Sequence, residues 1–160
     1  MRNTIKIFIA TAFFLSLSTT VLAALPTELS TVIAEAQTHH QADYLKLQNL
    51  EDLIPDNYLK ARVQKPTAAR AMKRLDIHEG VLLEALLKPS LDLVPPQTFP
   101  NHISEREKAK WKNRVLEALQ VGAAAALTHR QTPHVEAALA LSLSRNENAA
   151  VKGPLCVFYG

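Results

Sequence analysis

Apolar residues are distributed differently in the first 23 residues than in the rest of the chain. A nearly unbroken apolar run over 7–17 follows the basic residues Arg2 and Lys6, and small polar residues occupy 18–20 before Ala23. This order is typical of a cleaved secretory signal peptide, 1–23. The run is shorter than the roughly 20 apolar residues that cross a membrane. We therefore expect the processed chain, 24–160, to be periplasmic or secreted, without stable membrane insertion.

After the signal peptide, apolar residues recur at steps of three and four, which predicts helices. The first such stripe predicts one helix from Thr27 to Leu47 and consists of Leu29, Val32, Ile33, Ala36, His40, Tyr44 and Leu47. The same periodicity predicts further helices over 68–75, 81–87, 104–127, 133–143 and 149–159. No alternating run indicates a strand. The sequence thus predicts an all-α fold in a single domain, 24–160.

Helix boundaries are marked by local signals. Ser104 and Glu107 have the spacing of a capping box, and Thr132 followed by Pro133 is the preferred start of a helix. Turn-forming residues and a glycine over 76–80 predict a break. Four prolines over 89–101 predict a long irregular loop, and such loops are often functional.

An alanine-rich helix, a turn and a leucine-rich helix follow one another at 68–87 and again at 119–143. In the second copy a polar turn at 146–148 leads to the pair Val151–Lys152. This order resembles HEAT-like helical repeats over roughly 68–87 and 119–160. The resemblance implies stacked antiparallel helical hairpins, an α-solenoid fragment in which each unit covers the apolar face of the next. An irregular helical bundle is the alternative interpretation.

The charge balance excludes one class of partner. The full chain has 18 basic and 15 acidic residues, and removal of Arg2 and Lys6 with the signal peptide leaves 16 basic residues against 15 acidic ones. Nucleic-acid binding requires a concentrated basic surface, so we expect no nucleic-acid partner. Cys156 is the only cysteine, so no disulfide can form within one chain. Its apolar neighbours predict that Cys156 is buried.

Residues that often carry chemistry are present but lack the spacing of an active or metal site. His129 and His134 flank a turn without a clear third ligand, whereas zinc needs three or four. Asp76, His78 and Glu79 fit a turn with a helix-capping role. We therefore expect no metal, no cofactor and no catalysis. The alternative is a small exported hydrolase or metal-dependent enzyme that uses His78, His129 or His134.

The most basic segment of the chain, 60–74, contains no acid. Within it, Arg70, Lys73 and Arg74 form a candidate surface for an acidic partner protein or for anionic lipid headgroups, and we group Trp111 with them as a candidate partner-binding residue. The sequence thus predicts an exported helical module that binds a protein, such as a periplasmic inhibitor, an immunity-type protein or a scaffold. A structural accessory of an envelope or secretion complex is a further alternative. The apolar C-terminus is a candidate surface for self-association.

Overall fold

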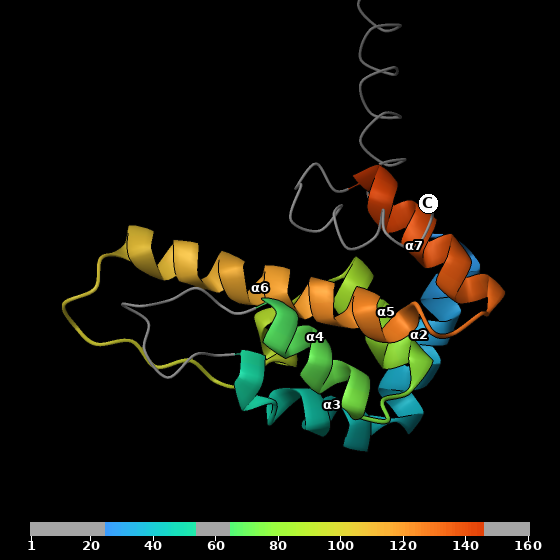
Figure 1. The fold of residues 1–160 in the computed structure, drawn as a ribbon, viewed down its shortest axis with the longest axis horizontal. Helices are drawn as coiled ribbons and strands as arrows, with labels where there is room; N and C mark the ends of the chain where they lie inside the picture. Colours follow the sequence, from blue (N-terminus) through green and yellow to red (C-terminus); the bar gives the residue numbers. More distant parts are fainter. Residues whose placement is uncertain (1–24, 54–64, 146–160) are drawn as a thin grey trace, which may run out of the picture.

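Regular structure is entirely helical in the computed structural model, which describes residues 25–53 and 65–145. Six α-helices and two 3-10 turns occur in these two ranges and pack as a helical bundle (Figure 1). The helices are α2 (Thr27–His39), α3 (Gln41–Gln48), α4 (Lys65–Arg74), α5 (Glu79–Leu87), α6 (Glu105–Leu127) and α7 (Pro133–Arg145); the 3-10 turns are η1 (Glu51–Leu53) and η3 (Leu91–Leu93). The prediction of an all-α fold is confirmed.

Several predicted features lie outside the described residues. These are the signal peptide, the basic residues at 60 and 62, the predicted last helix with Cys156, and the polar turn at 146–148. The HEAT-like resemblance stays a prediction, since much of the segment that carries it belongs to this set. Within the described residues, α2 contacts both α5 and α7, and α6 contacts both α4 and α5.

The longest helix of the described residues, α6, is the element against which α4 and α5 pack (Figure 1). It begins with the predicted capping box: the Ser104 hydroxyl accepts the Glu107 N–H at 3.3 Å, and the Glu107 carboxylate accepts the Ser104 N–H at 3.0 Å. Its C-terminal half is buried from Val121 to Leu127. Its N-terminal half extends past α4 and carries most of the exposed charges of the helix.

Replacing Ser104 by alanine is expected to lower the free energy of unfolding by about 1 kcal/mol, because the first turn of α6 loses an N-cap acceptor. Urea denaturation followed by circular dichroism measures this change. Ser144→Ala is the matched control, because the Ser144 hydroxyl only donates to the Leu141 carbonyl late in α7. Its effect is expected to stay within about 0.5 kcal/mol. Equal losses in the two variants would contradict a capping role for Ser104.

The first predicted helix is divided into α2 and α3 at His40, where the backbone leaves the helical region with φ −120° and ψ 40°. The prediction of one continuous helix was therefore wrong. The apolar stripe is still used on both sides of the break, since Ile33, Ala36, Tyr44 and Leu47 are all buried. The break turns α3 toward η3, so the two buried faces meet different neighbours.

Helix α5 has nine residues and is surrounded by α2, α6 and α7. Most of its side chains are inaccessible to solvent, namely those of Val81, Leu82, Leu83, Ala85 and Leu86. Gly80 lets α2 approach its first turn, because a Cβ there would lie 2.6 Å from the Ala36 Cβ and 2.7 Å from the Val32 carbonyl oxygen. The break predicted at 76–80 is confirmed over 75–78, just before α5.

The last described helix, α7, starts as the sequence predicts. Pro133 is its first residue, and the Thr132 hydroxyl accepts the Val135 N–H at 3.3 Å. Its buried face packs on α5 and α2. No helix in the described ranges is both long enough and apolar enough to cross a lipid bilayer.

Candidate functional site

One face of α4 is basic and exposed to solvent. Arg70, Lys73 and Arg74 are all exposed, while Ala68 and Met72 on the opposite face are fully buried against α6. Within the described ranges, no carboxylate forms an ion pair with any of the three cations. We call Arg70, Lys73 and Arg74 the α4 basic face.

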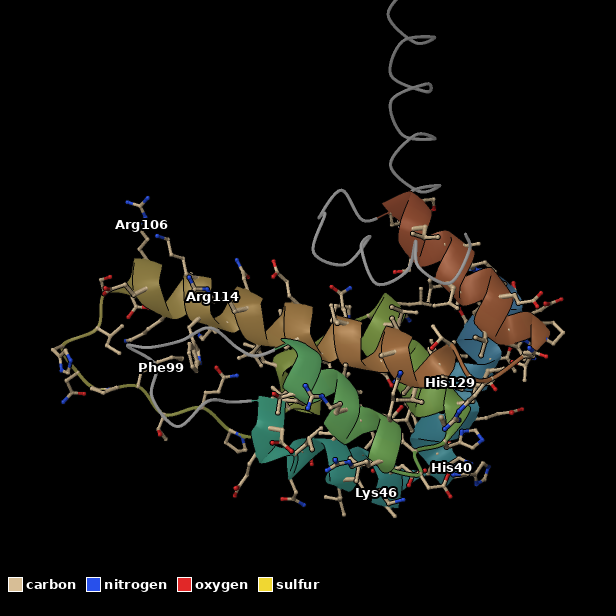
Figure 2. All side chains as sticks on the ribbon, in the orientation of Figure 1. His40, Lys46, Phe99, Arg106, Arg114 and His129 are labelled. Atoms are coloured by element: carbon tan, nitrogen blue, oxygen red, sulfur yellow. The ribbon has the colours of Figure 1, made fainter. Side chains whose placement is uncertain are left out.

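Two features make this face a fixed arrangement. Met72 lies directly over Gly122, which brings α4 close to the buried half of α6. The C-terminal end of α4 is tied to α3, because the Lys46 ammonium donates to the Asp76 carbonyl at 2.7 Å and pairs with the Asp43 carboxylate at 2.7 Å. The ammonium of Lys46, labelled in Figure 2, is thus paired with the Asp43 carboxylate and holds the turn that follows α4.

Trp111 does not lie on this face. Only 6% of its surface is exposed, and its ring meets that of Phe99 edge to face, with centroids 6.5 Å apart and an interplanar angle of 85°. Edge-to-face pairs of this kind stabilise beyond the apolar area that they bury. Trp111 thus attaches the proline-rich loop to the N-terminal half of α6, where Figure 2 shows Phe99 beneath the helix.

The proline-rich loop is anchored at both ends. Leu93 and Val94 are buried at its start, and Ile103 is buried at its end. The Gln48 side-chain amide donates to the Asp92 carbonyl at 2.9 Å and so joins the end of α3 to η3. A half-open hollow of about 510 Å³ lies beside this contact and is lined by Gln48, Asn49, Leu91, Asp92, Val94 and Pro96. Its walls supply one carboxylate and no cation or nucleophile.

At the opposite end of the molecule, three interhelical junctions meet. The rings of His40 and His78 stack with centroids 3.6 Å apart and planes inclined by 7°. The Asp43 carboxylate accepts the backbone N–H of His78 at 2.8 Å, and the Arg130 guanidinium donates to the Ile77 carbonyl at 2.5 Å. We call the group formed by these five residues the histidine junction.

The carboxylate of the histidine junction is held in its charged form. Burial alone would raise the pKa of Asp43, but the Lys46 ammonium and the His78 backbone N–H together outweigh it and hold that pKa below its ordinary value. Asp43 is therefore charged at neutral pH and fully engaged in binding the turn before α5. A carboxylate used in this way has a positioning role.

The candidate metal ligands are dispersed. His129 is exposed, His134 is half-buried at the start of α7, and Glu79 accepts a hydrogen bond from the Thr132 hydroxyl at 2.8 Å. Among the described residues, no group of three or more His, Cys, Asp or Glu side chains has an arrangement that could hold a metal ion. The predicted capping role of the turn at 76–79 is confirmed, because the His78 ring caps α5.

A second polar contact joins α2, α3 and α5. The Tyr44 hydroxyl donates to the Glu84 carboxylate, which also accepts the Gln37 amide at 2.7 Å. Burial raises the pKa of Tyr44, and the Glu84 carboxylate raises it further. The hydroxyl thus stays protonated and acts as a donor. No spacing signal in the sequence pairs Tyr44 with Glu84, since the contact depends on the break at His40.

Comparisons with known proteins assign no family to this arrangement. No protein-family model matches the chain, and neither a curated protein nor a solved structure shows significant similarity to it.

Proposed function

We propose that this chain is an exported, non-catalytic helical module that binds an acidic surface of a partner protein through the α4 basic face. The observation that carries the proposal is the exposure of three neighbouring cations that no carboxylate of the described residues neutralises. Exposed charges that are not neutralised raise the association rate with a surface of opposite charge. They also fix the orientation in which that surface binds.

The packing of α4 favours a protein over a flexible polyanion as the partner. The helix is fixed against α6 by Met72 and Ala68, so its three cations project from fixed backbone positions. A rigid pattern of charges discriminates between folded partners whose own charges are equally fixed. The signal peptide predicted at 1–23 supports binding to the partner in the periplasm or outside the cell.

The experiment is a binding measurement with the processed, affinity-tagged chain recovered from the cell envelope fraction. Proteins captured from an envelope extract are purified and titrated against the wild type and against the triple variant Arg70→Gln, Lys73→Gln, Arg74→Gln. The variant is expected to weaken binding roughly tenfold or more, mainly through a slower association rate. Wild-type binding is also expected to weaken when salt rises from about 50 to about 300 mM, because exposed charges are screened.

The matched control is the triple variant Lys88→Gln, Arg106→Gln, Lys110→Gln. It removes the same number of charges from exposed positions on other elements, so a general effect of net charge would appear in both variants. Binding is expected to be unchanged in the control. A captured protein that binds both triple variants as tightly as the wild type, at low and high salt, would contradict the proposal.

A further inference from the structure

The imidazole ring of His78 forms the N-terminal cap of α5. Its Nδ1 accepts the backbone N–H of Gly80 at 3.2 Å, while the His78 carbonyl accepts the N–H groups of Val81 and Leu82. A ring nitrogen that accepts a hydrogen bond carries a lone pair and no proton. The cap is therefore made only by the neutral ring, with its proton on Nε2.

Protonation would place an N–H on Nδ1, opposite the Gly80 N–H that it now accepts. It would also place a positive charge at the N-terminus of a helix, where the helix dipole is repulsive to cations. A half-turn of the ring about χ2 would keep its plane parallel to that of His40, which now lies within 7° of it, but would move Nδ1 away from the Gly80 N–H. Protonation of His78 thus has two effects at once: it removes the cap of α5, and it adds a positive charge to the histidine junction.

The groups that face His78 come from each element packed against it. His40 stacks on the ring at the α2–α3 break, and Arg130 donates to the preceding carbonyl from the α6–α7 turn. The negative groups are already occupied: Asp43 binds Lys46 and the His78 N–H, and Glu79 accepts from Thr132. Asp76, in the same turn, presents its carbonyl to Lys46. Asp43 and Glu79 favour the protonated ring, but burial, His40 and Arg130 together outweigh them.

We propose that His78, stacked on His40, is an acid-sensitive cap whose protonation opens the first turn of α5 and the α4–α5 turn before it. The inference does not depend on the α4 basic face or on any partner. The histidine junction holds three interhelical connections at one point, so protonation there changes the conformation of this part of the fold.

The direction of the pH effect follows from the surroundings of the ring. Burial lowers the pKa of His78, as do His40 and Arg130, and these effects exceed the opposing influence of Asp43 and Glu79. The folded chain thus binds fewer protons at this ring than the unfolded chain does. The stability contributed by the cap is present above the ordinary histidine pKa of about 6.5 and is lost as the pH falls through the lower folded value.

The test is amide hydrogen exchange of the processed wild-type chain, measured by NMR as protection factors so that the intrinsic pH dependence of exchange is removed. Between about pH 7.5 and pH 5, protection of the Gly80, Val81 and Leu82 amides is expected to fall roughly five- to tenfold, because a helix loses its cap and gains an unfavourable charge. In His78→Asn it is expected to stay constant, because the asparagine side chain caps helices and does not titrate.

His102→Asn is the matched control. It removes an exposed histidine before α6 and is expected to keep the pH dependence of the wild type at α5. Equal protection of α5 in the wild type and in His78→Asn across this pH range would overturn the proposal.

A second measurement applies if His78→Asn does not fold. Titration of the wild-type imidazoles by NMR follows the His78 ring directly, and His40→Gln removes its stacked neighbour. The loss of α5 protection is expected to follow the titration of His78 and to shift to higher pH in His40→Gln, because His40 lowers the pKa of His78 in the wild type. Titration of His78 without any change in α5 protection would refute the proposal.

Discussion

Replacing Leu83 by alanine is expected to lower the free energy of unfolding by about 2–5 kcal/mol, the cost of truncating a fully buried leucine. Leu83 is inaccessible to solvent on α5, which contacts α2, α6 and α7. Because α5 has only nine residues, few other side chains hold these neighbours together. Single domains are commonly stable by about 5–15 kcal/mol, so this one substitution removes a large part of the total. Denaturant titration followed by circular dichroism and tryptophan fluorescence measures the loss.

Leu45→Ala is the matched control for Leu83→Ala, since the same atoms are removed from a side chain that is 55% exposed. Its effect is expected to stay within about 0.5 kcal/mol. The comparison separates the packing of α5 from the helix propensity of leucine, which both variants change alike. If Leu83→Ala were as harmless as Leu45→Ala, α5 would not lie at the centre of the bundle in solution.

Gly80→Ala is the second substitution expected to have a large effect. The added Cβ would lie 2.6 Å from the Ala36 Cβ and 2.7 Å from the Val32 carbonyl oxygen, so α2 or α5 would have to move. Overpacking of a core typically costs about 1–3 kcal/mol, which exceeds the gain of about 1 kcal/mol from replacing a helical glycine by alanine. We expect a net loss of stability, measured as a lower midpoint of thermal or urea unfolding.

The matched control for this effect is Gly122→Ala on α6. The Cβ added there would overlap the side chain of Met72 near its sulfur, while the nearest backbone oxygen is 3.5 Å away. Met72 is fully buried and would have to shift, but its unbranched side chain adapts more easily than the backbone oxygen met at position 80, and the alanine improves helix propensity. Gly122→Ala is therefore expected to be close to neutral. A larger loss for Gly122→Ala than for Gly80→Ala would contradict the packing of α2 on α5 described above.

Helix ends were predictable because their signals are local. The Ser104–Glu107 box and the Thr132–Pro133 start depend on side chains within a few residues of the backbone that they cap, and both are confirmed. The break of the first helix was not predictable in this way. The apolar stripe continues through His40, and what accompanies the break is a set of contacts with His78 and its N–H, which lie far along the chain.

The same distinction applies to the candidate sites. The α4 basic face was predictable, because the absence of acids around Arg70, Lys73 and Arg74 is visible in the sequence and their exposure follows from the helical period. The helical period predicts that Trp111 lies on the apolar side of α6. Its contact with Phe99 was not predictable, because that contact depends on the path of the proline-rich loop. The capping role of His78 was predictable, but its stack on His40 was not.

The approach of α2 and α5 at Gly80 restricts how this chain can change during evolution. A side chain at position 80 requires space that the Ala36 Cβ and the backbone of position 32 now occupy, and a smaller residue at position 36 would free only part of it. A divergent relative that keeps this arrangement would therefore carry small residues at both positions, and a capping residue such as histidine, asparagine or serine two residues before the glycine. This short combination offers a criterion for recognising such relatives when overall sequence identity has been lost.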